Sequence, residues 1–412
     1  MYAKGLCEER RQKRRDSIRV FQVFDLGPRF PRSDEREKGM AEKKQVKVEE
    51  LQRPSVEMLY SDEIARLKEH DKDKPKPLGW AMTPDSVVKF VLGDKKLDIV
   101  HKFVGTRRFI ERCVVALATN RGLMLIGEPG TAKSYLSEIL SAAISGDSTL
   151  IVQGSAGTTE DDIKYSWNYA LLLSQGPTQA SMVPAPLHDG MTAGKLVRFE
   201  EITRCPLEIQ DTLLSILSDR VMTIPEFDEQ HKTLYAKAGF NVIATANTRD
   251  RGVNEMSAAL KRRFNFETVH PIQNLKQERE LVQQQMQHRL DRAGIPVRFS
   301  DDATELLVTT FHELRTGKTL GGQALEKMST VMSTAEAVEV GYASSLHAFY
   351  FGASNVKPDH LIDNLIGAAL KENEDDLKKL RLYFNQVVKG RKGEHWQAFY
   401  KASRGSLGTE NS

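Results

Sequence analysis

An eight-residue stretch decides the fold of this 412-residue chain: Gly127-Glu128-Pro129-Gly130-Thr131-Ala132-Lys133-Ser134. An apolar run at residues 123–126 precedes it, and a pattern of apolar residues at helical spacing follows it at residues 135–140. A strand, a glycine-rich loop and a helix in this order predict a phosphate-binding loop, because the loop N–H groups and the helix N-terminus together attract an anion. All eight residues are therefore candidate nucleotide-binding residues. The alternative is a simple Gly/Pro turn between a buried strand and a helix.

Three positions of this loop carry the predicted chemistry. Lys133 is placed to reach the β- and γ-phosphates of ATP, and the Ser134 hydroxyl is placed to ligate Mg²⁺. Ala132 stands where such loops usually have glycine. Alanine is small enough to let the loop pass close to phosphate, but it lacks glycine's easy access to positive φ.

The composition predicts a soluble, globular protein of two or three domains, with 40% hydrophobic and 28% charged residues. A net charge of +3 is small for this length and provides no bulk electrostatic case for nucleic acid. Cys7, Cys113 and Cys205 are odd in number and far apart, which fits neither a disulfide framework nor a metal site and favours a reducing cytosol. No apolar run approaches the roughly 18 residues of a membrane span. The expected location is cytoplasmic.

Residues 1–78 are predicted to be a charged, largely disordered tail and linker. Residues 1–50 lack sustained periodicity, residues 51–67 carry a weak helical pattern, and a Lys/Pro run at residues 70–77 marks a domain boundary. A basic arm for nucleic acid is the alternative, although acids interleave the cluster. The run Met40-Ala41-Glu42-Lys43-Lys44 resembles an ordinary cytosolic start, which raises the hypothesis that the residues before Met40 are not native; an intact mass tests it.

A second chemical cluster lies at residues 195–201, where an apolar run ends in Glu200 and Glu201. In P-loop ATPases a strand beside the phosphates carries an acid that holds Mg²⁺, and an adjacent acid can polarise the attacking water. Alternation along a strand predicts that the two carboxylates point to opposite faces and take these separate roles. Two features do not fit: the metal-side acid is usually the shorter Asp, and Arg198 is a charge in a buried strand, where it needs a partner. The alternative is a solvated acidic turn.

A core strand at residues 240–247 ends in Asn247, whose amide can orient water or the γ-phosphate; a turn residue is the alternative. Arg262 and Arg263 follow a short helical pattern, where arginines usually compensate the helix dipole. Other predicted elements are a short buried strand at residues 149–152, an amphipathic insertion at 167–173, a helix at 209–217 and a hairpin arm at 220–226.

Beyond Pro271 the pattern shifts to helices, which predicts a separate all-helical domain. The helices expected there are residues 275–292, 302–313, 322–339, 358–370 and 372–388. The predicted domains are residues 1–78 as tail and linker, 79–272 as an α/β ATP-binding domain, 273–390 as a helical lid and 391–412 as a polar C-terminal tail.

The order and spacing of these motifs resemble the MoxR group of AAA+ ATPases over residues 83–388. Residues 127–134 are similar to Walker A, and their Ala-Lys-Ser ending resembles the RavA-type and MCM branches. The remaining matches are residues 185–187 with the Gly-Pro-Leu element, 200–206 with Asp-Glu-Ile-Asn-Arg-Ala-Pro, 244–247 with sensor 1 and 261–264 with Leu-Asp-Arg-Phe.

The resemblance implies an AAA+ P-loop NTPase domain with a five-stranded parallel sheet, followed by an all-helical lid. It implies that Glu201 is the general base, that Glu200 supports the metal, that Asn247 positions the water and that Arg263 is an arginine finger for a neighbouring subunit. Arg262 is the runner-up for that finger. Residues 167–173 would belong to a helix-2 insert and residues 220–224 to a pre-sensor-1 hairpin.

One family feature does not carry over. The stretch at residues 321–324 is matched with Ser-Pro-Arg-Ala, the start of a lid helix whose Arg is sensor 2. Gln323 stands in place of that Arg and brings no charge, so sensor 2 stays unassigned, with Lys327 or another cation as a substitute.

The resemblance also implies a function: an ATP-hydrolysing hexameric ring, with ATP and Mg²⁺ as cofactors, that remodels partner proteins. Its partners would be further copies of itself, a protein client and a von Willebrand A-domain protein. One alternative is a nucleic-acid motor of the MCM branch, which shares Ala-Lys-Ser but needs a large N-terminal DNA-binding part. The other is a nucleotide-regulated scaffold with little hydrolysis, motivated by Ala132, Glu200 and Gln323 together.

Overall fold

The computed structural model describes residues 51–247, 254–371 and 373–407. The chain divides into two compact units, Met1–Leu51 and Gln52–Ser412, and the description below concerns the second. The predicted tail up to residue 50, the Met40 start and Cys7 lie outside the described residues. Within the described ranges, no helix is long and apolar enough to cross a membrane.

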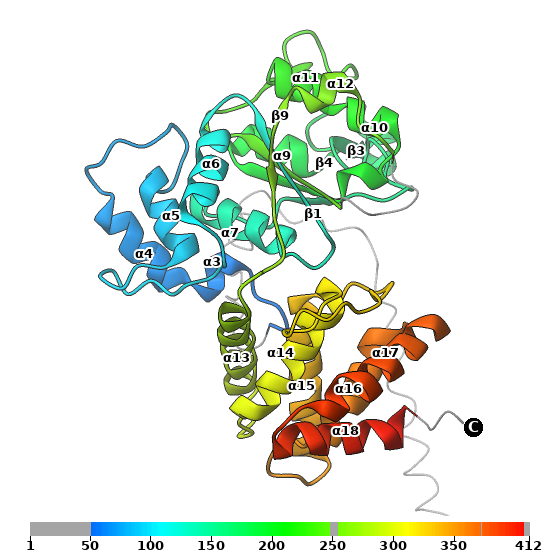
Figure 1. Cartoon of the computed structure of the whole chain (residues 1–412). Helices are drawn as coiled ribbons and strands as arrows, with labels where there is room; N and C mark the ends of the chain where they lie inside the picture. The colour runs from blue at the N-terminus through cyan, green and yellow to red at the C-terminus, as the bar shows by residue number, and fades with distance from the viewer. Residues whose placement is uncertain (1–50, 248–253, 372, 408–412) are drawn as a thin grey trace, which may run out of the picture. The chain divides into compact units, whose positions relative to one another are not determined.

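A five-stranded parallel sheet forms the centre of the α/β part (Figure 1), in the strand order β2-β5-β8-β1-β9. The strands are β1 (Gly122–Gly127), β2 (Ile151–Gln153), β5 (Leu196–Glu200), β8 (Asn241–Asn247) and β9 (Phe264–Thr268). The central strands β5 and β8 are almost wholly buried, as near-continuous apolar runs in a parallel sheet require. The predicted five-stranded α/β fold is confirmed.

The strand β2 lies at the edge of this sheet, which corrects the prediction of a short buried strand at residues 149–152. Only Val152 is buried, and Ile151 and Gln153 are exposed. β2 pairs with β5 alone, so no neighbouring strand covers its other side.

Five helices build up the N-terminal side of the α/β part: α3 (Val56–Leu59), α4 (Ser61–His70), α5 (Pro84–Leu92), α6 (Arg107–Ala118) and α7 (Lys133–Ser145). Val56 and Leu67 belong to the same hydrophobic core as α5 to α7. The buried Lys102 ammonium pairs with Glu63 of α4 at 2.5 Å and ties that helix to the core. The prediction of a disordered tail and linker up to residue 78 is therefore wrong over α3 and α4, whose apolar face packs on the folded domain.

Two antiparallel strand pairs lie outside the main sheet. One includes the hairpin arm predicted at residues 220–226, and the other includes the insertion predicted at residues 167–173, for which no strands were predicted. β3 (Tyr165–Trp167) pairs with β4 (Met182–Pro184), and α8 (Tyr169–Gln175) lies between them. β6 (Val221–Thr223) pairs with β7 (Thr233–Tyr235). The hairpins touch, because the Trp167 ring meets Phe227 edge-on at 5.7 Å and the Tyr165 hydroxyl donates to Glu226 at 3.0 Å.

The remaining elements of the α/β part are short: α9 (Pro186–Ala193), η2 (Ile202–Arg204), α10 (Leu207–Asp211), α11 (Leu213–Ser218) and α12 (Ala258–Lys261). The single helix expected at residues 209–217 is broken at Thr212, whose hydroxyl donates to Ile209 O at 2.7 Å. Such a bond to a preceding carbonyl competes with regular helix geometry.

The C-terminal part is all-helical, as predicted, and surrounds a core of its own. Its elements are α13 (Leu275–Arg292), α14 (Asp301–Thr316), α15 (Thr334–Tyr350), α16 (Pro358–Leu370), α17 (Glu374–Gln386), η3 (Val388–Gly390) and α18 (Glu394–Ser406). The polar tail expected from residue 391 is wrong over α18. The side chains of Trp396 and Phe399 face inward from α18 and are only 3% and 1% exposed.

The helix expected at residues 322–339 is also wrong, because α15 begins at Thr334. Ser333 and Glu336 form a capping box there. The preceding loop is held by the buried Asp376 carboxylate, which accepts backbone N–H bonds from Ser329 and Thr330. Burial raises the pKa of Asp376, but hydrogen bonds from Ser329 and Thr330 outweigh burial and lower it to about 2. Gln323 therefore lies in this loop and not at the start of a lid helix, so the match that placed sensor 2 at residues 321–324 fails.

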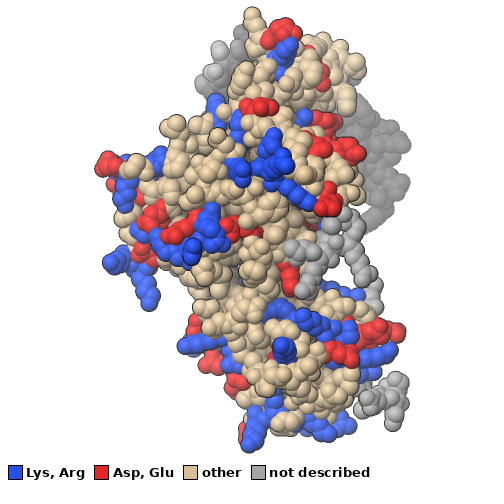
Figure 2. Space-filling view, turned by 45° about the horizontal axis from the view of Figure 1, so that its top comes forward, with Lys and Arg blue, Asp and Glu red and all other residues tan. Residues whose placement is uncertain are grey.

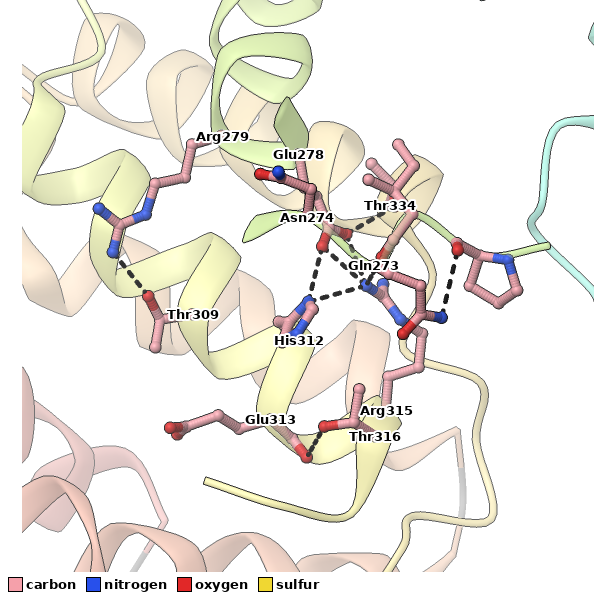
Figure 3. Close-up of polar contacts among 12 residues, drawn as sticks. Gln273, Asn274, Glu278, Arg279, Thr309, His312, Glu313, Arg315, Thr316 and Thr334 are labelled. Carbon is pink, nitrogen blue, oxygen red and sulfur yellow. Dashed lines mark hydrogen bonds and ion pairs between the residues drawn. The ribbon is translucent and has the colours of Figure 1, made fainter. Parts of the chain in front are cut away.

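A buried polar cluster joins three lid helices around Glu278 of α13 (Figure 3). Its carboxylate accepts from Arg315 at 2.7 and 2.8 Å and from the Thr334 hydroxyl at 2.6 Å, and it lies 3.0 Å from His312 Nδ1. Burial raises the pKa of Glu278, but the bonds from His312 and Arg315 outweigh burial and hold it below its ordinary value. The cluster fixes the start of α15 against α13 and α14.

On the face shown in Figure 2, lysine and arginine side chains are interspersed with aspartate and glutamate. This distribution agrees with the net charge of +3 over 412 residues. Among the described residues drawn on this face, the basic side chains do not form the one-sided basic surface that phosphate backbones attract.

Candidate functional site

The predicted site residues meet at the carboxyl edge of the sheet. Gly127, the last residue of β1, pairs in register with Asn247, the last residue of β8. β5, on the other side of β8, ends at Glu200. Because all these strands are parallel, their carboxyl ends share one edge, which is where open α/β sheets bind ligands.

The loop after β1 has the backbone shape of a phosphate cradle. A Cβ on Gly127 would lie 2.4 Å from Val269 O, so only glycine fits there. Gly130 has φ of 73°, and Ala132 has φ of 62° immediately before α7. Ala132 thus adopts the left-handed conformation that favours glycine, at a cost of about 1–2 kcal/mol.

Lys133 begins α7, and its side chain folds back over the loop. Its ammonium donates to Gly127 O at 3.1 Å and to Glu128 O at 2.8 Å, while the Thr131 hydroxyl donates to Glu128 O at 2.9 Å. The carbonyl-bound ammonium therefore lies at the loop itself, where a phosphate would compete for its protons.

Glu200 is the most enclosed acid of the site, with 2% of its surface exposed. Its Oε2 accepts from the Ser134 hydroxyl at 2.7 Å and from the Thr245 hydroxyl at 2.7 Å. A carboxylate and a serine hydroxyl side by side are hard oxygen ligands, which suit Mg²⁺. The described residues hold no group of three or more His, Cys, Asp or Glu that could bind a metal.

Arg198, the charge that the sequence placed in a buried strand, has its partners. Its guanidinium donates to Glu200 Oε1, to the Ser137 hydroxyl, to Ser134 O and to Ser148 O, each at 3.0 Å. The expectation that this charge needs a partner is confirmed.

Glu201 does not continue the strand, and this changes the reason why the two acids separate. β5 ends at Glu200, and Glu201 follows with φ of 54°, in the left-handed region. The divergence of the two carboxylates therefore comes from this turn and not from strand alternation. Glu201 Oε2 pairs with Arg204 Nε at 2.8 Å, and the Glu201 N–H donates to the Thr245 hydroxyl at 3.0 Å.

Two supporting residues escaped the sequence analysis. Thr245 bridges the acids, since its hydroxyl donates to Glu200 and accepts from the backbone of Glu201. Ser137 lies 2.5 Å from Glu200 Oε1 and accepts from Arg198. A signal for each exists in the sequence: Thr245 is a polar residue in a buried strand, and Ser137 is one helical turn after Ser134, on the same face.

Arg263 is not brought to this site. Its carbonyl accepts from Gly122 N at 2.9 Å, at the start of β1, and its Nε donates to the Ser218 hydroxyl at 2.7 Å. Gly122 and Gly127 are five strand residues apart, which at roughly 3.3 Å per residue is about 16 Å. Arg262 caps the C-terminus of α12 and is exposed. Neither arginine stands at the loop of its own chain.

The two cysteines in the described part are free and buried. Burial raises the pKa of Cys113 to about 12 and also raises that of Cys205. Thiols with raised pKa values are poor nucleophiles at neutral pH, so neither is a candidate for catalysis.

Comparison with protein families gives two matches. The description "AAA domain (dynein-related subfamily)" matches residues 122–264, and "YehL-like AAA+ ATPase C-terminal domain" matches residues 276–405. The first covers the sheet from β1 to the start of β9, and the second covers the lid from α13 into α18.

The chain is also similar to individual proteins. The chain is 53% identical over 355 residues to a protein called YehL from Escherichia coli (strain K12), which covers 85% of this chain and 97% of that protein. It is 26% identical over 180 residues to the chaperone MoxR1 of Mycobacterium tuberculosis (strain ATCC 25618 / H37Rv), which covers 43% of this chain and 44% of MoxR1. A crystal structure of NtrX from Brucella abortus in complex with ATP aligns with a TM-score of 0.44 at 16% identity, over 75% of this chain and 70% of that one.

Proposed function

The chain belongs to the YehL-like family of MoxR-type AAA+ ATPases, and on this premise we propose that it hydrolyses ATP in a ring of identical subunits and uses the hydrolysis to remodel partner proteins. The observation that carries the proposal is the 2.7 Å contact between the Ser134 hydroxyl and Glu200, at the end of the loop that Lys133 closes. This contact joins the two halves of a nucleotide site that are far apart in the sequence.

Each residue then has a defined task. Residues 127–134 bind the phosphates through backbone N–H groups, and Lys133 exchanges its carbonyl partners for phosphate oxygens. Ser134 and Glu200 hold Mg²⁺, which, when bound, neutralises charge on the β- and γ-phosphates. Glu201 accepts the proton of the attacking water, and Asn247 orients that water.

A ring is supported by the position of Arg263. Because it lies about 16 Å from Gly127 along β1, an arginine at this place serves a neighbouring copy better than its own. An arginine finger supplied in trans is worth about 10³-fold or more in phosphoryl transfer.

Exposed apolar side chains on the two hairpins support a protein client. Tyr169 and Leu173 of α8 are 70% and 89% exposed, and Tyr235 of β7 is 71% exposed. Apolar side chains held in water by short hairpins suit contact with another polypeptide. A von Willebrand A-domain partner completes the proposal and rests on the family resemblance alone. The proposed cytoplasmic location rests on the three widely spaced cysteines.

Subunit mixing tests the ring. Glu201→Gln alone and Arg263→Ala alone should each lose phosphate release, and their mixture should recover part of it, because some interfaces then combine an intact base with an intact finger. No recovery at any mixing ratio argues against a finger in trans. If the wild-type protein releases phosphate no faster than Glu201→Gln, the result would instead favour a nucleotide-regulated scaffold.

A second experiment addresses the client. The Glu201→Gln variant should retain ATP and hold its client, so a pull-down with ATP, read by mass spectrometry, should enrich proteins that ADP releases.

Stimulation of ATP turnover by DNA with strong salt dependence would favour a nucleic-acid motor.

A further inference from the structure

We propose that Arg198 is a positioning residue for Glu200, and that the two act as one unit which presents a single carboxylate oxygen, Oε2, to the nucleotide-bound metal. The inference rests on the proposed function and concerns how this chain uses Glu200 at a place where the shorter Asp is usual.

The two side chains share one buried face of the sheet. Arg198 and Glu200 are two residues apart on β5, so they point the same way, toward α7. They are 6% and 2% exposed, and Arg198 Nη2 donates to Glu200 Oε1 at 3.0 Å. The pair is therefore shielded from water, and its geometry is not averaged by solvent.

The guanidinium is itself fixed by the main chain. Nη1 donates to Ser148 O, and Nη2 donates to Ser134 O, both at 3.0 Å. Because the planar guanidinium donates to a backbone carbonyl from each of its two ends, its orientation is fixed. Arg198 thus holds the carboxylate of Glu200 in a fixed position relative to the first turn of α7.

The two oxygens of Glu200 have different surroundings. Oε1 receives the Arg198 cation and lies 2.5 Å from the Ser137 hydroxyl. Among the residues that the structure describes, those that donate to Oε2 are the hydroxyls of Ser134 and Thr245. A hydroxyl can rotate its proton away and offer a lone pair to a metal, whereas a guanidinium has no lone pair to offer. Oε2, beside Ser134, is the oxygen open to Mg²⁺.

Stability does not explain why an arginine stands here. Buried parallel strands are normally apolar, and replacing a buried ion pair with packed apolar residues is often neutral or stabilising. Glutamate has one more rotatable bond than aspartate, so its carboxylate needs an added restraint to act as a fixed ligand. Arg198 supplies that restraint, and its charge also offsets that of Glu200, so metal binding depends on the phosphates of the nucleotide.

Nucleotide binding, measured with and without Mg²⁺, tests the Arg198–Glu200 unit independently of ATP hydrolysis. The probe is a fluorescent ADP analogue, titrated once in EDTA and once in excess Mg²⁺. For Arg198→Met we expect the affinity for the ADP analogue in EDTA to be unchanged. The increase in affinity that Mg²⁺ causes should be at least 10-fold smaller than in the wild type. Half-maximal phosphate release should need about a 10-fold higher Mg²⁺ concentration.

The double variant Arg198→Met/Glu200→Asp should recover the Mg²⁺ effect to within about 3-fold, because the shorter acid needs no restraint. The matched control is Arg315→Met, which removes the buried arginine of the lid pair with Glu278 and should leave the Mg²⁺ effect unchanged. Thermal melting of each variant shows whether it is folded.

A wild-type Mg²⁺ effect in folded Arg198→Met overturns the proposal, and so does an equal loss in Arg315→Met. Should Arg198→Met not fold, Arg198→Lys keeps the charge but removes the planar fork that fixes Glu200, and it is expected to lose at least 10-fold of the Mg²⁺ effect. Full retention in folded Arg198→Lys overturns the proposal. If Glu201→Gln still releases phosphate while the Mg²⁺ results hold, the proposed base fails and the Arg198–Glu200 unit stands.

Discussion

Glu200 at the sheet edge and Glu278 in the lid are two buried carboxylates with similar partners. Each pairs with an arginine, Arg198 or Arg315, and each receives hydroxyl protons. Around Glu278 the arginine reaches both oxygens and His312 and Thr334 take the remaining positions (Figure 3). Around Glu200 the arginine donates to one oxygen, and the described partners of the other oxygen are two hydroxyls.

The difference teaches that burial and ion pairing do not by themselves mark a functional acid. A carboxylate whose oxygens are both held by cationic donors serves the packing of helices. One with an oxygen left to exchangeable hydroxyls, at the carboxyl edge of a parallel sheet, is available to a ligand.

The largest expected effect is on stability and concerns the lid acid, Glu278. Glu278→Gln leaves Arg315 buried beside a neutral amide, so the free energy of unfolding should fall by about 3–5 kcal/mol in denaturant titration. The control is Glu339→Gln, which breaks the exposed pair with Arg289 and should cost less than about 1 kcal/mol. Equal losses in the two variants would contradict a structural role for the Glu278 cluster.

Glu200→Gln should act mainly on turnover. Removing the metal-side charge is expected to lower phosphate release by about 10²–10³-fold, in the range typical of a lost electrostatic contact in a transition state. The measurement is kcat at saturating ATP and Mg²⁺, with Glu278→Gln at low temperature as the comparison. A Glu200→Gln variant that turns over at the wild-type rate would remove the functional half of the comparison.

Lowering the pH should reduce the stability of the lid through two of its carboxylates, Glu278 and Asp376. The pKa of Glu278 lies below its ordinary value of 4.5 and that of Asp376 is about 2, so both contribute stability that is present above their unfolded pKa values and lost as the pH falls through the folded ones. The free energy of unfolding should therefore decline between about pH 5 and pH 2 in the wild type. In Glu278→Gln this decline should be smaller, and an unchanged slope would show that Glu278 is not responsible for it.

Ala132→Gly should have the smallest effect. Glycine relieves the left-handed strain of about 1–2 kcal/mol but adds about 0.5–1 kcal/mol of unfolded-state freedom, so the net gain in stability should be about 0–1.5 kcal/mol. Phosphate release should stay within about 3-fold of wild type. A large loss of turnover would show that the Ala132 side chain has a role in the loop beyond its backbone shape.

Local patterns predicted the elements that depend on neighbours in sequence. The P-loop strand and helix, the core strand ending in Asn247 and the helices α13 and α16 follow from apolar spacing and start signals. The errors lie where tertiary contacts overrule local polarity. α18 is polar overall yet buries Trp396, and the loop before α15 is held by Asp376, more than 40 residues away in sequence.

The sequence alone predicted a glycine-rich loop, a pair of acids and an amide at the ends of apolar strands, because loop glycines and strand length are local properties. Only the tertiary structure decided what each acid contacts. In the folded chain Glu201 adopts a left-handed conformation, and Thr245 forms hydrogen bonds to both acids. Arg198 lies among backbone carbonyls and donates to Glu200. Such contacts join α7, β5 and β8, and their distances depend on how helix and sheet pack, which no single stretch of sequence specifies.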